Sequence, residues 1–359
     1  MVGHSTGKKV DLPILNNILV EAKEGNIKLV ATDLEIGTTQ MIRGKVEEEG
    51  SCAIDAKTLI NYISLLPGEK VEIKEKGGKV EIISDKYQTK INSQAGEEFP
   101  LIPEVKRDKK IILSVNELKQ ALTQTYFAAA SNENRMELSG VLFYFKDNSL
   151  FLVATDSYRL AERKVKIEAV DLMGDKEKII IPNKTISELL KILNNLDDEN
   201  DSEDTEKIEI FITETQILFK IGSTEMVSRL IEGHFPDYEQ IIPTQIKLKL
   251  TLNRAELIRG VKAVSLFSKN DINDIKLEAS NGKLKMFSAN QEGESSVELD
   301  GDFQGEMNEL SLNYRYLIDG LNNINSDKVL LEVVDGNAPC ILRPAGGTDY
   351  VYIIMPIRQ

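Results

Sequence analysis

Tryptophan is absent from this chain, and histidine and cysteine occur only twice each among its 359 residues. His4 and His234 are far apart in the sequence, and Cys52 and Cys340 form no CxxC pair. No Ser/His/Asp or Cys/His spacing typical of nucleophilic catalysis is visible, and neither a metal-ligand cluster nor a phosphate-binding glycine loop is present. We therefore expect a protein that is not an enzyme, with no catalytic residue, metal or cofactor. The cysteines are expected to be reduced thiols in a cytosolic protein.

Long apolar runs are also missing. None approaches the roughly 20 residues of a membrane span, and residues 1–10 lack the apolar region of a signal peptide. Residues 1–11 are polar and are expected to be a flexible lead-in. These absences predict a soluble, cytoplasmic protein with no membrane partner.

Positive charge is in deficit, since the formal net charge is −14. Taken alone, this value disfavours a nucleic-acid partner. The run DDENDSEDTE at residues 197–206 supplies seven acidic residues and no basic one, which is half of that net charge. A solvated, mobile loop is the ordinary interpretation of such a run.

The chain contains a repeat. The run LFLVATDSYRL at residues 150–160 recurs as IKLVATDLEIG at 27–37, and a weaker copy, LKMFSAN, lies at 284–290. With Thr32, Thr155 and Ala289 taken as equivalent, the copies are 123 and 134 residues apart. These spacings have the size of domains. We predict three domains, at residues 1–107, 108–245 and 246–359.

The repeated units combine strands with helices. Alternating apolar and polar residues predict antiparallel strands. Asp55, Ser114, Asn253 and Asn313 are the expected N-caps of helices. The second and third units open with a strand and a helix that the first unit lacks. We expect an α+β architecture in which helices pack on one face of antiparallel sheets.

Four motifs carry a resemblance to a known family: LPIL at residues 12–15, VATD followed by RL within 153–160, FPDY at 235–238 and MPIR at 355–358. With them the chain resembles bacterial DNA sliding clamps, the β subunit of the DNA polymerase III holoenzyme. The resemblance extends from Leu12 to Gln359. It implies three tandem DNA-clamp domains, each with two helices packed on antiparallel sheets, in a ring-forming fold whose first domain lacks its opening strand and helix.

The resemblance also implies a function. Two chains would associate head to tail as a homodimer and encircle duplex DNA without regard to its sequence. The ring would act in DNA replication as a processivity factor. It would tether the DNA polymerase III catalytic subunit, the clamp loader and repair proteins through their clamp-motif peptides.

Two groups of residues follow from the resemblance. A peptide-binding pocket between the second and third units would consist of Thr155, Tyr158, Arg159, Leu160, Pro236, Ile241, Ile353, Met355, Pro356 and Ile357, with Arg135 and Leu138 at its rim. Without the resemblance, the apolar members would be interpreted as ordinary core. The dimer interface would place Phe99, Leu101 and Ile102 against Leu266 and Phe267.

Basic residues on the outer faces of the predicted helices are candidates for contact with DNA phosphates. They are Lys57, Lys119, Lys184, Lys191, Arg254, Arg259, Lys262 and Arg315. Each alone is an ordinary solvated helix charge, so only the collection indicates DNA.

The chain departs from the family pattern in places. Either its start is misassigned, or the sequence is truncated, or this clamp is unusual in its short first unit. Met136 and Glu137 stand where the family often has aromatic or basic residues that touch DNA, and the terminal Gln359 is polar where an apolar residue is usual. The alternative function is a monomeric, clamp-like, peptide-binding adaptor that does not encircle DNA.

Overall fold

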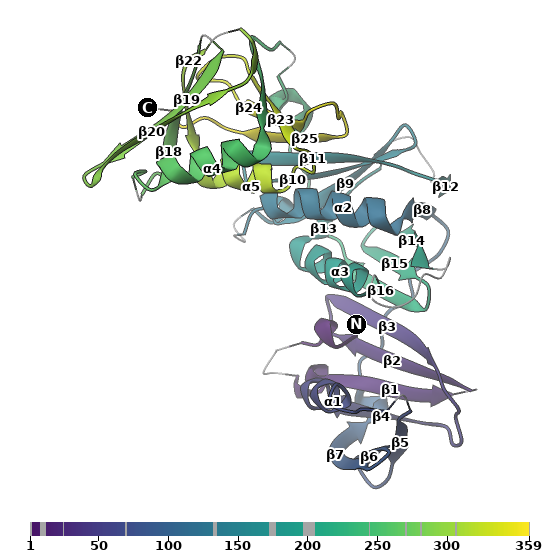
Figure 1. Ribbon diagram of the computed structural model, residues 1–359. Helices are drawn as coiled ribbons and strands as arrows, with labels where there is room; N and C mark the ends of the chain where they lie inside the picture. Colours follow the sequence, from purple (N-terminus) through teal and green to yellow (C-terminus); the bar gives the residue numbers. More distant parts are fainter. Residues whose placement is uncertain are drawn as a thin grey trace. The chain divides into compact units, whose positions relative to one another are not determined.

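The computed structural model describes residues 2–7, 12–23, 25–68, 70–131, 135–171, 177–196, 205–243, 245–269, 271–280, 282–305 and 307–358. Most of the acidic run, Gln359 and residues 8–11 lie outside them. The chain forms two compact units (Figure 1). Unit 1 comprises Met1–Glu117, Ile167–Gly174 and Lys184–Leu230, and unit 2 comprises Leu118–Lys166, Asp175–Asn183 and Ile231–Gln359.

Unit 1 is built on one antiparallel sheet. Among its described residues, twelve strands follow the order β12-β8-β14-β15-β16-β3-β2-β1-β4-β7-β6-β5. The strands are β1 (Asn17–Lys23), β2 (Asn26–Thr32), β3 (Ile36–Arg43), β4 (Gly50–Asp55), β5 (Glu72–Glu75), β6 (Lys79–Ser84), β7 (Tyr87–Ala95), β8 (Lys110–Ser114), β12 (Ala169–Asp171), β14 (Lys207–Ile212), β15 (Gln216–Ile221) and β16 (Thr224–Arg229). Helices α1 (Ala56–Ile63) and α3 (Asn183–Leu196) also belong to it, and α2 (Val115–Thr125) continues into unit 2.

Unit 2 contains two sheets. A nine-stranded sheet has the order β13-β9-β10-β11-β25-β24-β23-β17-β21, and a four-stranded sheet has the order β20-β19-β18-β22, both counted over the described residues. The strands of the larger sheet are β9 (Gly140–Lys146), β10 (Ser149–Thr155), β11 (Arg159–Lys166), β13 (Glu177–Pro182), β17 (Leu248–Asn253), β21 (Asp302–Gln304), β23 (Lys328–Val333), β24 (Cys340–Pro344) and β25 (Tyr350–Ile354). Strands β18 (Asp274–Ser280), β19 (Lys283–Asn290), β20 (Gly293–Asp300) and β22 (Met307–Asn313) form the smaller sheet, and the helices are α4 (Arg254–Ser265) and α5 (Tyr314–Asn322).

Local chemistry explains where the helices begin. The Asp55 carboxylate accepts from the Thr58 N–H at 2.8 Å, and the Asn253 side chain accepts from the Glu256 N–H at 3.0 Å. Asn313 caps α5 in the same way. These side chains satisfy N–H groups that have no partner within the first helical turn. The N-caps expected from the sequence at these positions are confirmed.

The elements repeat three times, as the sequence predicts. In the second and third repeats a strand and a helix, β8 with α2 and β17 with α4, precede the shared strand–strand–strand pattern. In the first repeat the described residues before β1 form only two short 3-10 helices, η1 (Val2–Ser5) and η2 (Pro13–Asn16). The expected α+β fold built from three repeats is confirmed.

Candidate functional site

The turn between β10 and β11 is rigid because its side chains bond to its own backbone. Asp156 Oδ1 accepts from the N–H groups of Tyr158 and Arg159 at 2.9 and 3.0 Å. Thr155 donates its hydroxyl to the Arg159 carbonyl and accepts from the Ser157 N–H. Ser157 adopts φ of 79°, a left-handed conformation that these bonds hold in place. The turn thereby presents Tyr158 outward, with 64% of this residue exposed.

Arg159 ties this turn to the third repeat within unit 2. Its guanidinium donates to Asp156 Oδ2 at 3.0 Å, to Asp319 Oδ2 at 2.5 Å and to the Phe127 carbonyl at 3.0 Å. It also lies over the ring of Tyr316, with 4.6 Å between Cζ and the ring centroid.

The charge of Arg159 is stabilised despite its burial. Burial alone lowers the pKa of the guanidinium, but the neighbouring Tyr352, Asp319 and Asp156 outweigh it, so the pKa lies above its usual range. The guanidinium therefore remains a permanent cation between the two repeats.

An apolar cluster lies beside this turn. Leu160 on β11 pairs with Ile353 on β25, and both belong to a cluster that includes Tyr238 and Val351. The chain then leaves β25 through Met355, whose N–H donates to the Tyr158 carbonyl at 2.8 Å. The C-terminal segment is thus fixed directly against the turn.

We call this region the docking surface; it consists of the twelve residues that the sequence assigned to the peptide-binding pocket. All twelve lie in unit 2. Thr155, Leu138, Leu160 and Ile353 are buried, Arg135, Tyr158 and Ile241 are exposed, and Arg159, Pro236, Met355, Pro356 and Ile357 are intermediate. The Arg135 guanidinium donates to Ser157 Oγ at 3.1 Å and to Glu137, which connects the rim to the turn.

Glu162 and Tyr238 shift each other's pKa at this cluster. Burial raises the pKa of Glu162 on β11, while its hydrogen bond with Tyr238 acts in the opposite direction. Burial, with the Glu162 charge, also raises the pKa of the Tyr238 hydroxyl above its usual range.

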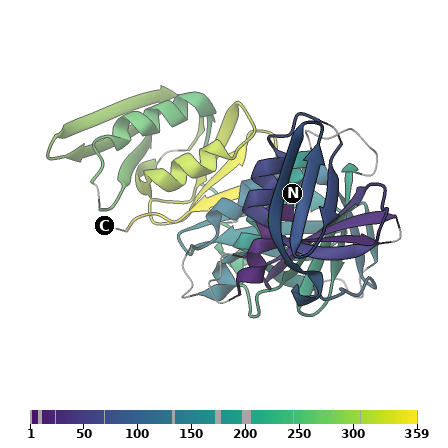
Figure 2. The ribbon, with the colours of Figure 1, turned by 90° about the horizontal axis from the view of Figure 1, so that it is seen from below.

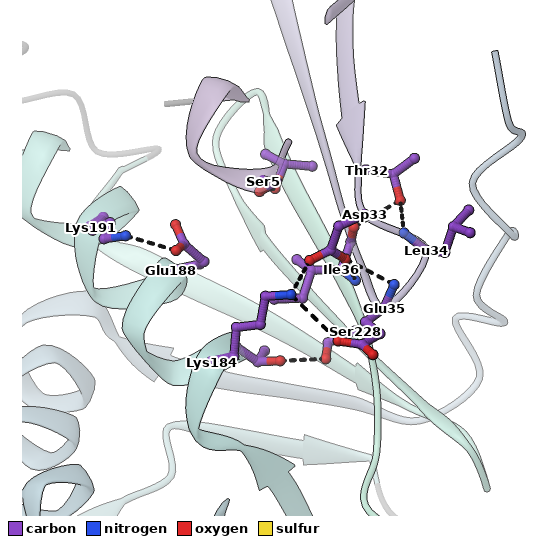
Figure 3. Close-up of polar contacts among 12 residues, drawn as sticks. Ser5, Thr32, Asp33, Leu34, Glu35, Ile36, Lys184, Glu188, Lys191 and Ser228 are labelled. Carbon is purple, nitrogen blue, oxygen red and sulfur yellow. Dashed lines mark hydrogen bonds and ion pairs between the residues drawn. The ribbon is translucent and has the colours of Figure 1, made fainter. Parts of the chain in front are cut away.

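Unit 1 contains a second copy of the turn, between β2 and β3 (Figure 3). Asp33 Oδ1 accepts from the N–H groups of Glu35 and Ile36 at 2.9 and 2.8 Å. Thr32 donates to the Ile36 carbonyl and accepts from the Leu34 N–H, and Leu34 has φ of 75°. Asp33 and Asp156 therefore cap their turns in the same way.

The cation beside this second turn comes from another element. Lys184, at the start of α3, pairs with Asp33 Oδ2 and with Glu35, as Figure 3 shows. Burial raises the pKa of the Asp33 carboxyl, but the Lys184 hydrogen bond and the Ile36 and Glu35 N–H groups outweigh it and leave the pKa lowered. Lys184, assigned to DNA contact from the sequence, therefore has a partner inside unit 1.

The side chain that follows the turn differs between the first and second repeats. Gly37 is the second residue of β3, which begins at Ile36, and Leu160 is the second residue of β11, which begins at Arg159. Gly37 therefore occupies the position that Leu160 has in the second repeat. A Cβ on Gly37 would lie 2.7 Å from the Ile102 side chain, so Ile102 occupies the space that a larger residue would take. The turn is duplicated, but its surroundings are not.

The basic residues assigned to DNA are distributed over all five helices. Lys57, Arg259, Lys262 and Arg315 are exposed. Lys191 pairs with Glu188 at 2.7 Å, and Arg254 donates to the carbonyls of Ser326 and Leu321. Lys119 lies on α2 and is half-buried. Contact of these residues with DNA stays a prediction.

The residues assigned to the dimer interface differ in exposure. Leu101 and Leu266 are 95% and 74% exposed, whereas Phe99 is buried with Val30 and Ala53 in the first repeat. Ile102 lies against Gly37, and Phe267 lies against Gly293 at the start of β20. The interface stays a prediction.

Sequence reasoning missed the partners of Arg159. Phe127, Tyr316 and Asp319 come from segments far apart in the chain, and no local motif connects them. The pairing of β11 with β25 and the position of α5 bring these residues into contact with Arg159.

No metal site and no membrane-spanning helix occur in the part of the chain that the structure describes. Groups of three or more His, Cys, Asp or Glu side chains that could hold a metal ion are absent from it. None of its helices is long and apolar enough to cross a membrane.

Comparison with known proteins covers almost the whole chain. Models of the DNA polymerase III beta subunit match its N-terminal domain at residues 2–103, its central domain at 112–237 and its C-terminal domain at 239–358. The beta sliding clamp of Staphylococcus aureus (strain Mu50 / ATCC 700699) is 33% identical over 370 residues, covering 98% of this chain and 93% of that protein.

Solved structures give the same result. The DNA polymerase III beta subunit of Thermotoga maritima superposes with a TM-score of 0.91 at 26% identity, over 100% of this chain and 95% of that one. A putative beta subunit of Eubacterium rectale gives a TM-score of 0.90 at 29% identity, with the same coverage. The repeated fold, the three domain matches and these relatives agree, and the chain therefore belongs to the family of the DNA polymerase III beta subunit, the bacterial beta sliding clamps.

Proposed function

We propose that two copies of this clamp associate head to tail around duplex DNA, and that the docking surface tethers partner proteins to the ring. The partners would be the DNA polymerase III catalytic subunit, the clamp loader and other proteins that carry clamp-motif peptides, in the cytoplasm. The clamp itself would be a non-catalytic processivity factor.

The observation that carries this proposal is the construction of the docking surface. A turn fixed by Asp156 and Arg159 presents Tyr158 beside an apolar cluster that contains Leu160 and Ile353. A rigid turn next to apolar side chains suits an extended peptide with Leu and Phe anchors, because few groups must be ordered when the peptide binds.

Exposed cations and leucines support the ring. Arg259 and Lys262 on α4 and Arg315 on α5 are exposed on packed helices of unit 2, where they could meet phosphates. Leu101 and Leu266 are large apolar residues with little cover in the single chain, and a second chain would remove them from water.

The first test is the mass in solution, measured by light scattering over a dilution series. A mass about twice 40.2 kDa that persists on dilution supports the closed dimer. The matched variants are Leu101→Asp, expected to give a monomer, and Leu12→Asp, which changes another exposed leucine and should leave the dimer intact. Retention on circular but not linear duplex DNA then tests encirclement.

The monomeric adaptor is the second candidate, and one observation favours it. Phe99 is buried in its own repeat and contributes little surface to a second chain. A stable monomer that still binds a Leu- and Phe-containing clamp-motif peptide would support this alternative and contradict the ring.

A further inference from the structure

Side chains hold the connection between the second and third repeats on the sheet of unit 2. The connection comprises residues 232–246 and carries two members of the docking surface, Pro236 and Ile241. In its described part, which is all of it except residue 244, no backbone hydrogen bond reaches a strand. Backbone pairing with a strand is found at Ile231 on one side and at Lys247 on the other. The positions of Pro236 and Ile241 therefore depend on what the side chains of the connection contact.

Tyr238 is the one fully buried side chain among the described residues of the connection, with 1% exposed. It opens the 3-10 helix η7 (Tyr238–Ile241) and belongs to the apolar cluster that contains Leu160 and Ile353. Its ring meets Phe235 edge-on, with 6.3 Å between the two ring centroids. The ring is thus surrounded by apolar groups, and its buried hydroxyl requires a polar partner among them.

That partner is Glu162 on β11. The Tyr238 hydroxyl donates to the Glu162 carboxylate, which can only accept when it is ionised. The neighbours of Glu162 across the sheet, Val153 on β10 and Val351 on β25, are both apolar, and Tyr144 of β9 also lies near the hydroxyl. β11 belongs to the sheet in which blue strands of the second repeat and yellow strands of the third lie side by side (Figures 1 and 2). The pair therefore fastens the connection at the junction of the two repeats.

Charged groups face Glu162 from the elements packed around it. Arg343 of β24 and Lys146 of β9 favour its ionised form, and Glu239 of η7 opposes it. Arg343 is itself paired with Glu332 of β23, with 3.2 Å between Nε and Oε2, and Lys146 lies 3.9 Å from Glu239. Burial outweighs the favourable neighbours and raises the pKa of Glu162 above its ordinary value. This carboxyl therefore takes up a proton at a higher pH than an exposed glutamate does.

We propose that Glu162, through Tyr238, positions Pro236 and Ile241 in the docking surface, so that the affinity for partner peptides falls when Glu162 is protonated. This inference rests on the docking function proposed above. An ionised carboxylate accepts a stronger hydrogen bond from a hydroxyl than a neutral carboxyl does, so protonation loosens Tyr238 and with it the connection. Glu162 is a positioning residue, because it acts through Tyr238 and is not one of the twelve residues of the docking surface.

Phenylalanine substitutions separate this role from the filling of space. Tyr238→Phe keeps the ring and removes the hydroxyl, and it should weaken binding of a clamp-motif peptide at least about tenfold at pH 7.5. The matched control is Tyr350→Phe. Tyr350 is fully buried on β25 of the same sheet, and its hydroxyl has no hydrogen-bond partner among the described residues. Its loss should leave the affinity unchanged. Fluorescence anisotropy measures both variants with a labelled peptide that contains Leu and Phe and no Asp, Glu or His.

A pH series tests the carboxylate. Between pH 7.5 and pH 5 the affinity of the wild type should fall about tenfold, and the fall should begin above the ordinary glutamate pKa of 4.5. Glu162→Gln still offers an acceptor but no charge, so it should bind weakly at both pH values and show no pH dependence. Glu239→Gln removes an exposed neighbouring carboxylate and should keep the pH dependence. Glu162→Gln combined with Tyr238→Phe should bind no more weakly than Tyr238→Phe alone.

Hydrogen exchange followed by mass spectrometry tests the connection without a peptide. At pH 7.5 the amides of residues 237–242 should exchange faster in Tyr238→Phe and Glu162→Gln than in the wild type, and Tyr350→Phe should match the wild type. Equal pH profiles for the wild type and Glu162→Gln, or equal affinities of the two phenylalanine variants, overturn the proposal. A wild type that binds no peptide at any pH contradicts the docking function itself. Exchange then decides whether the pair holds the connection, and unchanged exchange overturns that role as well.

Discussion

Asp33 and Asp156 make the same two hydrogen bonds in two copies of one turn. Each Oδ1 accepts from the N–H groups two and three residues ahead, and each Oδ2 pairs with a cation. The cation differs: Arg159 belongs to the turn itself, whereas Lys184 comes from α3. The same turn is therefore held by a different ion pair in each copy, and each ion pair can be tested separately.

We expect Asp33→Asn to lower the free energy of unfolding by about 1–3 kcal/mol at pH 7, since a buried, charge-assisted acceptor is lost. Folding lowers the pKa of the Asp33 carboxyl below its ordinary value of 3.8. The native state therefore binds fewer protons at Asp33 than the unfolded state does. Its stabilisation is complete above that value and is lost as the pH falls through the lower, folded pKa.

Urea unfolding of the wild type and of Asp33→Asn at pH 7 and near pH 3 measures this effect. The difference in free energy of unfolding between the two proteins should be smaller at the lower pH. A double-mutant cycle with Lys184→Met isolates the ion pair. A difference that stays constant with pH would show that the Asp33 charge contributes nothing.

Replacing Arg159 with alanine should destabilise the chain by about 3 kcal/mol, because Asp156 and the Phe127 carbonyl lose a buried partner. Lysine should not restore the loss, since an ammonium cannot reproduce the planar contacts with Asp156, Asp319 and the Tyr316 ring. Asp319→Ala should cost about 1 kcal/mol or less, because its side chain is 46% exposed. Denaturant unfolding ranks the three variants, and a full rescue by lysine would refute the role given to the guanidinium.

Tyr158→Ala should weaken binding of a labelled clamp-motif peptide at least about tenfold and change stability by less than about 0.5 kcal/mol. Tyr158 is 64% exposed and hydrogen-bonds through its backbone N–H and carbonyl, so its ring is accessible to a ligand. Tyr87→Ala on β7 is the matched control, since that tyrosine is also exposed. Fluorescence anisotropy gives both affinities, and equal losses would remove Tyr158 from the docking surface.

Replacing Lys57, Arg259, Lys262 and Arg315 together with glutamine should reduce the salt dependence of DNA association. Each lost phosphate contact lowers the slope of log K against log salt by about 0.9. The control variant replaces four exposed lysines outside the helices: Lys23, Lys86, Lys106 and Lys328. Retention on circular duplex over a salt series provides the slopes. If the two variants give the same slope, the helix residues are not the DNA contacts.

The repeated fold could be predicted from the sequence because its signals are local. Alternation along β6 and β19, the caps Asp55 and Asn253, and the recurrence of VATD each depend on neighbouring residues. The turn-capping hydrogen bonds of Asp33 and Asp156 depend on local chemistry of the same kind.

The contacts that hold the site could not be predicted in this way. The Arg159–Asp319 pair joins residues 160 positions apart, and the Lys184–Asp33 pair joins residues 151 apart. Neither has a sequence pattern, because strand pairing and helix placement decide which side chains meet. Lys184 illustrates the difficulty. Its position on a helix face predicted a side chain surrounded by solvent, whereas in the fold it forms an ion pair with Asp33.

Gly37→Leu tests whether Ile102 is the reason that the first repeat has glycine where the second has Leu160. A leucine there reproduces the residue found at Leu160, but its Cβ would lie 2.7 Å from Ile102, so we expect a loss of about 1–3 kcal/mol from overpacking. Ile102→Ala in the same chain empties that space and should recover part of the loss, although Ile102→Ala alone should destabilise by leaving a cavity. Urea unfolding of the two single variants and the double variant measures the coupling. Additive losses would mean that Ile102 does not exclude a larger residue at Gly37.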